Sequence, residues 1–385
     1  MMAFDFATAS RIVFGAGKAE EIAPAAREMG LKALVVAGAP SGILSSLLAG
    51  LEDHGVAVRQ FAVSGEPTVD LARQGAELAR QEECGLVIAI GGGSAIDAGK
   101  AIAMLLGNGG DPLDYLEVVG LGRKITKASA PFIAVPTTAG TGAEVTRNAV
   151  LASPEHKVKA SLRGPSMLPS VAVVDPELTL DLPPEITAST GLDALTQLIE
   201  PYVSYRANPM TDMFCLEGIR LAAGSLREAF HDGHSLKARE AMSLASLLGG
   251  LALANAGLGV VHGFAAPIGG MFAAPHGAVC AALLAGGIEV NIRALRARAP
   301  DHPSLERYRT VARLLTRDAA ASAEDAGPWV RQLREDLGVP ALGAFGIRPE
   351  HAATLVEKAA QASSMKANPI PLTAAELEEV LATAM

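Results

Sequence analysis

The stretch that decides the fold is Leu86–Lys100, LVIAIGGGSAIDAGK. Its first five residues form an unbroken apolar run, which is the pattern of a strand buried on both faces of a parallel sheet. Three glycines and a serine, Gly91-Gly-Gly-Ser94, separate this run from a helix. Glycines let the backbone approach a ligand closely, and the N–H groups at a helix start attract phosphate. The stretch therefore predicts a strand–turn–helix unit that can bind a phosphate, although a tight turn without a ligand has the same pattern.

Strand and helix patterns alternate through the first half of the chain. Strand-type runs also occur at residues 11–14, 33–37, 56–63, 133–136 and 171–174, and helical spacing occupies residues 18–29, 44–54 and 69–82. This alternation predicts an α/β domain, in which helices cover both faces of a parallel sheet. Asp175-Pro176 and the segment 181–184, DLPP, interrupt the pattern. We therefore expect the first domain to span residues 1–182.

A second polar loop follows the strand at residues 133–136. Residues 137–146, TTAGTGAEVT, contain four threonines and two glycines, and we expect them to lead into a helix. Ligands bind at the carboxyl ends of strands in open α/β sheets, so two such loops indicate a nucleotide site. A polar turn with a helix cap is the alternative. Asp97 and Lys100 could likewise be an ordinary pair on a helix surface.

Helical periodicity dominates residues 183–385, which predicts an all-helical second domain. Its most apolar stretch, Val261–Val279, reads VHGFAAPIGGMFAAPHGAV and contains two histidines but no Asp, Glu, Lys or Arg. Its prolines and glycines predict a helix carrying His262, a turn, and a second helix beginning near His276. That arrangement can bring the two imidazoles together.

An upstream helix, with the sequence GLDALTQLIE, carries Asp193 and Gln197 on one face at i, i+4 spacing. A carboxylate among apolar neighbours needs a partner, and imidazole nitrogen suits zinc and iron. Asp193, Gln197, His262 and His276 are therefore candidate metal ligands. The alternative is a pair of histidines that are hydrogen-bonded within the core.

Composition narrows the function classes. The formal net charge is −9 and no basic patch is visible, so we expect no nucleic-acid partner. No apolar run is long enough for a membrane span, and the N-terminus lacks the features of a signal peptide. Cys84, Cys215 and Cys280 are widely spaced in apolar surroundings, which is typical of buried thiols in a cytoplasmic protein.

Together, these motifs resemble the iron-containing (group III) alcohol dehydrogenases. The resemblance rests on Gly91-Gly-Gly-Ser94-x-x-Asp97-x-x-Lys100, Pro136-Thr-Thr-Ala-Gly-Thr-Gly-Ala-Glu144, Asp175-Pro176, Gly191-Leu-Asp193-Ala-Leu, His262-Gly and Pro275-His276-Gly, in the family's order and spacing. It implies a Rossmann-like dinucleotide-binding domain followed by an all-α metal domain, as in dehydroquinate synthase-like folds. It also implies a homodimer that transfers hydride reversibly between NAD(P)(H) and a small alcohol or aldehyde. One divalent metal, Fe²⁺ or Zn²⁺, would act as the Lewis acid.

The resemblance also implies roles for individual residues. The cofactor would contact the glycine turn and the threonine loop, at Gly91, Gly92, Gly93, Ser94, Asp97, Thr137, Thr138 and Thr141. Lys159 matches a lysine that contacts the nicotinamide-side ribose, and it joins Asp193, His262 and His276 as a catalytic candidate. These last three match three of the family's four metal ligands.

Three positions depart from the family pattern. Gln197 stands where a histidine ligand is usual, and an amide oxygen is a weaker and harder ligand. Ala266 replaces a histidine thought to relay protons, so water or the cofactor ribose would take that role. Gly38 and Ser41 follow the second strand without the carboxylate that disfavours a 2′-phosphate, so we expect NADP(H) or dual cofactor use.

Two alternatives remain. A maleylacetate reductase-like enzyme has the same fold but reduces a carbon–carbon double bond without a metal, and the missing histidines at Gln197 and Ala266 favour it mildly. A non-catalytic relative would keep the fold and bind cofactor without turnover. Metal content separates the first alternative from the alcohol dehydrogenase, and turnover separates the second.

Overall fold

The structure is a computed structural model that describes residues 3–156 and 158–385. The chain divides into two compact units. Residues 7–138 and 142–181 form one, which we call the α/β unit. Residues 3–6, 139–141 and 182–385 belong to the other, which we call the helical unit.

A six-stranded parallel sheet is the core of the α/β unit. Its strands are β1 (Arg11–Phe14), β2 (Lys32–Ala37), β3 (Ala57–Ala62), β4 (Leu86–Gly91), β5 (Phe132–Pro136) and β8 (Val171–Val174). They lie in the order β1-β8-β5-β4-β2-β3, and every pairing is parallel. The six predicted strands are confirmed. The chain order reverses between the neighbours β2 and β4, and such a switch point is where open α/β sheets bind ligands.

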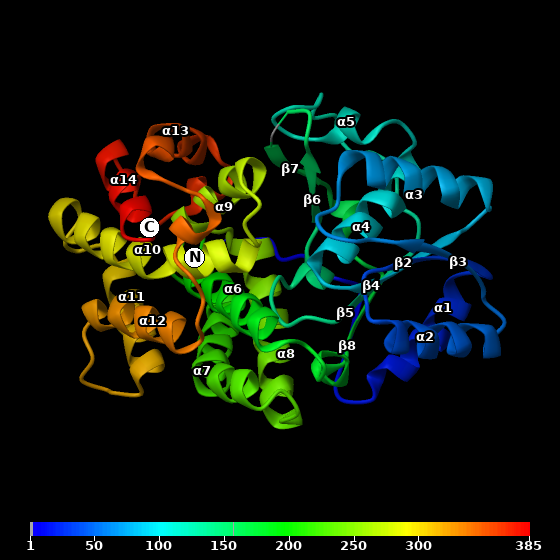
Figure 1. Cartoon of the computed structure of the whole chain (residues 1–385), viewed down its shortest axis with the longest axis horizontal. Helices are drawn as coiled ribbons and strands as arrows, with labels where there is room; N and C mark the ends of the chain where they lie inside the picture. The colour runs from blue at the N-terminus through cyan, green and yellow to red at the C-terminus, as the bar shows by residue number, and fades with distance from the viewer. Residues whose placement is uncertain (1–2, 157) are drawn as a thin grey trace. The chain divides into compact units, whose positions relative to one another are not determined.

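Helices cover both faces of this sheet (Figure 1). α1 (Ile22–Met29) and α2 (Ser41–Asp53) pack with Val35 and Ile88, whereas α3 (Val69–Gln81) and α4 (Gly93–Asn108) pack with Val36 and Ala89. Successive residues of a strand point to opposite faces, so strands covered on both sides must be apolar throughout. This requirement explains the unbroken apolar run that begins at Leu86.

The expectation of a helix after the threonine loop is wrong. A short 3-10 helix, Ala143–Val145, leads into the antiparallel hairpin β6 (Asn148–Ser153) and β7 (Val158–Arg163). Burial alternates along β6, as expected for a strand with one face packed on a core. A four-residue helix, α5 (Pro112–Tyr115), precedes β5. The threonine loop therefore joins two strands instead of a strand and a helix.

A buried lysine attaches the hairpin to α4. Lys100 Nζ donates to Ala143 O at 2.9 Å and to Thr146 Oγ1 at 2.8 Å. Asp97 Oδ1 lies 3.2 Å from the same ammonium, and Asp97 Oδ2 accepts from Val150 N at 3.0 Å. Lys100 is 1% exposed, so the interpretation of Asp97 and Lys100 as a surface pair is wrong. The two side chains therefore bind the backbone of the hairpin and of the turn that precedes it.

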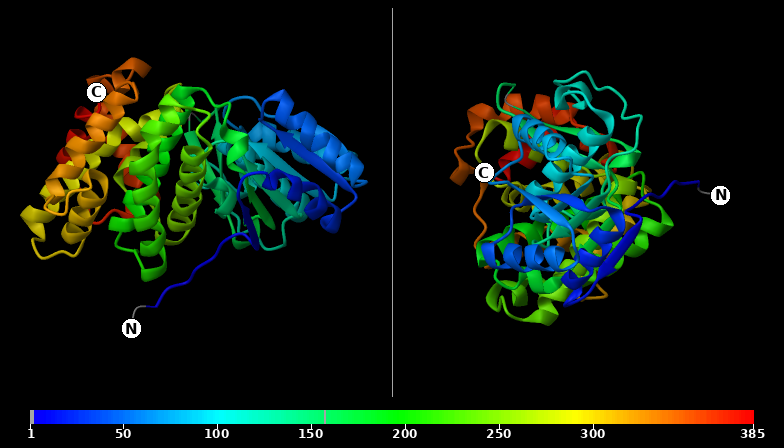
Figure 2. Two further views of the ribbon diagram at one scale, coloured as in Figure 1. Left: turned by 90° about the horizontal axis from the view of Figure 1, so that it is seen from below. Right: turned by 90° about the vertical axis from the view of Figure 1, so that its right-hand side faces the viewer.

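The described residues of the helical unit contain no strand. Its helices are α6 (Pro184–Val203), α7 (Pro209–His231), α8 (Leu236–Ala256), α9 (Val260–Met271), α10 (His276–Arg298), α11 (Ser304–Thr316), α12 (Ala326–Asp336), α13 (Ala352–Gln361) and α14 (Ala374–Ala382). α6, α7 and α8 lie side by side, drawn in green in Figures 1 and 2. A Cβ at Gly191 would lie 2.2 Å from Leu226 Cδ1, so α6 and α7 can pack this closely only with a glycine there.

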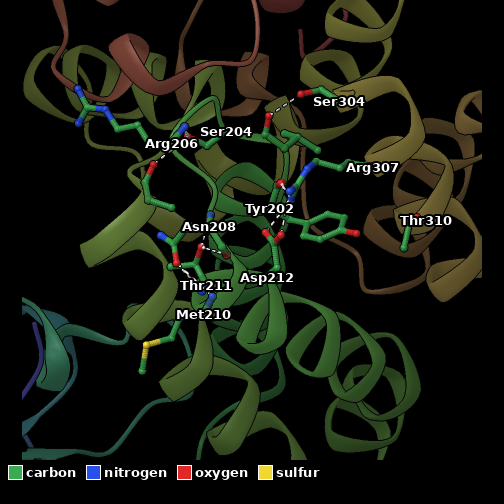
Figure 3. Close-up of polar contacts among 12 residues, drawn as sticks. Tyr202, Ser204, Arg206, Asn208, Met210, Thr211, Asp212, Ser304, Arg307 and Thr310 are labelled. Carbon is green, nitrogen blue, oxygen red and sulfur yellow. Dashed lines mark hydrogen bonds and ion pairs between the residues drawn. The ribbon is translucent and has the colours of Figure 1, made fainter. Parts of the chain in front are cut away.

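The C-terminal end of α6 is held by side chains from α11 (Figure 3). Arg307 donates to Tyr202 O at 2.8 Å and to Asp212 Oδ1 at 2.6 Å, and Ser304 Oγ donates to Val203 O at 3.0 Å. The last carbonyls of a helix have no partner within it, so these donors satisfy them. They fix the end of the helix that carries Asp193.

One described helix, α10, is long and apolar enough to cross a membrane. The described helices α8 and α9 together would also be long and apolar enough if they formed one bent span. In α10, 89% of the apolar window is buried inside the structure. That degree of burial is typical of a core helix, because the apolar surface is covered by protein.

Candidate metal centre and cofactor turn

The glycine turn lies at the carboxyl end of β4, beside the end of β2. Gly91 has φ +151°, and a Cβ there would lie 2.8 Å from Ala95 Cβ and 3.0 Å from the backbone of Gly38. A side chain at this position would therefore be strained and would collide with β2's continuation. The structure brings Gly38 and Gly91 together at the switch point of the sheet.

The first turn of α4 is not capped by a side chain. Its N-cap residue is Gly92, which has no side chain to accept from the first N–H groups, and Ser94 is only partly buried. Thr137 N donates to Gly91 O at 2.9 Å, and Thr138 Oγ1 lies 3.5 Å from where a Gly92 Cβ would be. Uncapped N–H groups and hydroxyls at a helix N-terminus suit the oxygens of a phosphate.

The other residues predicted to bind the cofactor are not part of the glycine turn. Asp97 is committed to Lys100 and Val150 N, and Thr141 belongs to the segment 139–141 of the helical unit. Ser41 is the exposed first residue of α2. Lys159, on β7, pairs with Glu66 Oε1 at 2.9 Å. Of the predicted cofactor set, the turn therefore gathers Gly38, Gly91–Ser94, Thr137 and Thr138.

Three helices of the helical unit bring the predicted metal ligands together. Asp193 lies on α6, His262 on α9 and His276 at the start of α10. Asp193 Oδ1 lies 3.5 Å from His262 Nε2 and 3.7 Å from His276 Nε2. The two imidazole centroids are 5.5 Å apart. The predicted helix–turn–helix arrangement of the two histidines is confirmed.

A carboxylate that we did not predict orients His262. Glu200 Oε2 accepts from His262 Nδ1 at 2.6 Å, and Glu200 Oε1 accepts from Val261 N at 2.7 Å. Because Nδ1 is used in this bond, Nε2 is the ring atom that faces Asp193, at 3.5 Å from Asp193 Oδ1. The signal in the sequence is the spacing of Asp193 and Glu200, which are two helical turns apart on the same face of α6.

A thiol also joins the cluster. Cys280 follows His276 by one turn of α10, and its Sγ lies 3.7 Å from His276 Nε2 and 3.8 Å from His262 Nε2. Asp193, His262, His276 and Cys280 each offer one ligand atom, and these atoms all lie within 4.8 Å of one another. The i, i+4 spacing of His276 and Cys280 is the signal in the sequence for this contact, and the prediction that the three cysteines are buried free thiols is confirmed.

The cluster carries a negative potential that favours cations. The neighbouring Cys280 raises the pKa of His276 to about 9, against the effect of burial. Burial alone would lower the pKa of His262, but Cys280 and Asp193 hold it well above its ordinary value. Burial alone would raise the pKa of Asp193, yet His276 and His262 lower it to about 2. The lowered pKa of Asp193 and the raised pKa values of the two histidines each favour the charged form of the group in this buried site.

Two buried oxygens in this cluster have no hydrogen-bond partner. Asp193 Oδ1 and Gln197 Oε1 form no hydrogen bond, although Asp193 is only 1% exposed and Gln197 only 2%. Gln197 Nε2 donates to Gly140 O at 3.3 Å. Buried oxygens without donors are costly unless a cation or proton satisfies them. Because the donor set of carboxylate, imidazoles and thiol suits zinc or iron, the residues present fit a divalent metal. The His276 side chain is 38% exposed, so the cluster reaches the surface of the helical unit there.

Comparisons with known proteins show the family of the chain. The family model described as iron-containing alcohol dehydrogenase matches residues 9–176, and the C-terminal model of the Fe-containing alcohol dehydrogenase family matches residues 187–385. The chain is 35% identical over 384 residues to alcohol dehydrogenase 4 of Schizosaccharomyces pombe, covering 97% of this chain and 87% of the relative.

Solved structures give the same result. A crystal structure of 1,3-propanediol oxidoreductase matches with a TM-score of 0.90 and 33% identity, covering 100% of both chains. The structure of sulfoacetaldehyde reductase from Bifidobacterium kashiwanohense, in complex with NAD⁺, matches with a TM-score of 0.85 and 31% identity, covering 100% of this chain and 99% of that one.

Proposed function

From the premise that the chain belongs to the iron-containing alcohol dehydrogenase family and is an oxidoreductase, we propose that it interconverts a small primary alcohol and its aldehyde. The nicotinamide of a bound cofactor would supply or accept the hydride, and the helical unit would hold one divalent metal. Its relatives, which include an alcohol dehydrogenase, a 1,3-propanediol oxidoreductase and a sulfoacetaldehyde reductase, support this substrate class.

The observation that carries the proposal is the buried cluster of Asp193, His262 and His276. These residues would hold the metal through Asp193 Oδ1 and the two Nε2 atoms, which lie 3.5 and 3.7 Å from that oxygen. A bound divalent metal supplies Lewis-acid stabilisation of negative charge on the substrate oxygen. Asp193 contributes negative charge that favours metal binding, and Glu200 keeps His262 in the orientation that directs Nε2 into the site.

The α/β unit would bind the cofactor. We assign the pyrophosphate to the N–H groups of Gly92, Gly93 and Ser94, because the first turn of α4 has no side-chain cap. Thr137 and Thr138 add hydroxyl donors beside the turn. Lys159 remains a proposed contact for the nicotinamide-side ribose, because its ammonium has donors beyond the one directed at Glu66.

We further propose that NADP(H) is accepted at least as well as NAD(H). The segment after β2, Gly38-Ala-Pro-Ser41, contains no carboxylate to repel a 2′-phosphate, and Ser41 is exposed. Measuring kcat/KM with both cofactors tests this proposal. A strong preference for NAD would contradict it without affecting the proposed reaction.

The proton of the alcohol needs a path that does not use a histidine at position 266. Ala266 is on α9, one turn after His262, and has no titratable group. We propose that water or the cofactor ribose carries this proton. Cytoplasmic location and a homodimer are further proposals, which rest on the free cysteines and on the family resemblance.

Metal analysis with activity measurement tests the main proposal. Protein purified without added metal or chelator should contain about one metal per chain. Oxidation of short primary alcohols should be lost after dialysis against a chelator and regained with Fe²⁺ or Zn²⁺. Turnover that ignores the chelator, in protein without metal, would favour the maleylacetate reductase-like alternative. Cofactor binding without turnover on any alcohol or carbonyl compound would favour a non-catalytic relative.

A further inference from the structure

We propose that Cys280 is a metal ligand, so that a thiolate completes the set formed by Asp193, His262 and His276. This inference rests on the proposed function, because it specifies the metal site of that function. It assigns Gln197 a supporting position beside the site instead of a place among the ligands.

The placement of Cys280 is the first argument. Its side chain is fully buried, and its sulfur contacts both metal-facing nitrogens, at 3.7 Å from His276 Nε2 and 3.8 Å from His262 Nε2. His276 and Cys280 project from the same face of α10, one turn apart. The helix therefore presents both donors to one point.

The four nitrogen–oxygen and nitrogen–sulfur distances among the ligand atoms are close to those around a tetrahedral metal. Metal–nitrogen and metal–oxygen bonds of about 2.0 Å with a metal–sulfur bond of about 2.3 Å place nitrogen and oxygen about 3.3 Å apart and nitrogen and sulfur about 3.6 Å apart. The nitrogen–oxygen distances here are 3.5 and 3.7 Å, and the nitrogen–sulfur distances are 3.7 and 3.8 Å. Each distance is within a few tenths of an ångström of the tetrahedral value.

An independent observation points to a cation at the same place. Asp193 Oδ1 is buried without any hydrogen bond, although it is surrounded by the two imidazoles and the thiol. A thiol is a weak donor and cannot satisfy a carboxylate oxygen well. A cation held by all four side chains would satisfy this oxygen and balance the negative charges of Asp193 and Cys280.

Gln197 is the competing candidate, since its Oε1 is also buried and unpartnered. Its Nε2 donates a hydrogen bond to Gly140 O, and its amide oxygen is a neutral, hard metal ligand. A thiolate carries a full negative charge and is a soft donor that selects zinc, cobalt and iron over magnesium or manganese. The proton of the thiol leaves to solvent when the metal binds.

Cobalt spectroscopy tests the assignment directly. Apoprotein, prepared by dialysis against a chelator, is titrated with Co²⁺ while its absorption is recorded. We expect a near-ultraviolet sulfur-to-cobalt charge-transfer band that saturates at about one ion per chain. Cys280→Ser should lose this band while keeping visible d–d absorption. Its affinity for Co²⁺ should be lower than that of the wild type by a factor of roughly ten.

Two variants control the experiment. Cys215→Ser removes another fully buried cysteine of the helical unit and should keep the band. Gln197→Ala should also keep it, because the amide is not the source of the absorption. X-ray absorption of the zinc-loaded wild type should show a sulfur scatterer at about 2.3 Å, a readout that requires no variant to fold.

The outcomes separate this inference from the proposed function. Metal binding at one ion per chain without a charge-transfer band or sulfur scatterer would overturn the role of Cys280 and leave the metal-dependent reaction standing. A band that survives in Cys280→Ser would also overturn it. Wild-type protein that binds no Co²⁺ or Zn²⁺ would overturn both proposals.

Discussion

The glycine turn of the α/β unit and the metal cluster of the helical unit are built in opposite ways. The turn uses the backbone of consecutive residues, Gly91–Ser94, at the end of one strand. The cluster uses side chains from three helices, α6, α9 and α10. Consequently, the turn is sensitive to any added side chain, whereas the cluster is sensitive to side-chain removal.

The two units also treat buried carboxylates differently. Asp193 has imidazoles within 3.7 Å and a pKa lowered to about 2. Glu144, in the 3-10 helix Ala143–Val145, is 2% exposed, and burial raises its pKa to about 7. One carboxylate is kept charged for a cation, whereas the other is protonated over part of the physiological range. The difference shows that partners, and not burial alone, decide the charge state.

The largest effect is expected from His262→Ala. Turnover should fall by about 10³-fold or more, because a lost Lewis acid removes several kcal/mol of stabilisation. Cofactor affinity, measured by fluorescence titration of the reduced nicotinamide, should stay within about twofold, since the change lies in the other unit. His234→Ala, at an exposed site of the helical unit, is the matched control. Full activity of His262→Ala would refute the metal role.

Glu144→Gln should reveal the raised pKa as a pH-dependent stability. A carboxyl group whose pKa is about 7 in the folded protein and 4.5 in the unfolded chain stabilises the fold fully below pH 4.5, and this contribution is lost as the pH rises through 7. The stability of the variant relative to wild type should therefore rise by about 3 kcal/mol between pH 4.5 and 8, because only the wild type loses this contribution.

Urea denaturation across this pH range measures the Glu144 effect. Glu52→Gln, at an exposed position of α2, tests whether loss of a carboxylate by itself changes the profile. Parallel stability profiles for wild type and Glu144→Gln would show that the buried carboxyl group does not titrate in this range.

Glu200→Gln should weaken the cluster without removing any ligand. The hydrogen bond to His262 Nδ1 orients the imidazole and raises its basicity, so metal affinity should fall roughly 10- to 100-fold. Competition with a chromophoric chelator measures this affinity. Glu240→Gln, on the exposed side of α8, should bind metal as the wild type does. Unchanged affinity in Glu200→Gln would mean that packing alone orients His262.

The smallest effect is expected from Gly91→Ala, which tests the turn. A Cβ there meets Ala95 Cβ at 2.8 Å at a φ of +151°, which costs about 1–3 kcal/mol in strain and shifts the backbone that would bind the cofactor. The cofactor Kd should rise about tenfold while metal content stays unchanged. Gly42→Ala, which has open space around it, is the control. Wild-type cofactor affinity in Gly91→Ala would mean that the turn does not approach the ligand closely.

The sequence alone was sufficient for the six strands and for the helices that carry Asp193, His262 and His276. Apolar runs and helical periodicity are local patterns, so they predict elements wherever burial follows the repeat of the backbone. The loop at residues 137–146 was misassigned because its hydroxyls resemble a helix start. The hairpin of β6 and β7 follows this loop instead of a helix, and the ammonium of the distant Lys100 binds the carbonyls of Ala143 and Asn148 where the loop meets the hairpin.

The candidate site divides in the same way. The sequence determined the two histidines, the carboxylate between apolar neighbours and the glycine turn, because each is a short motif whose chemistry can be recognised in place. Only the tertiary structure decided that Cys280 contacts both imidazoles, that Glu200 orients one of them, and that Asp97 supports a hairpin. These roles depend on which helix faces pack together, and packing is decided by the whole core and not by any one stretch of the chain.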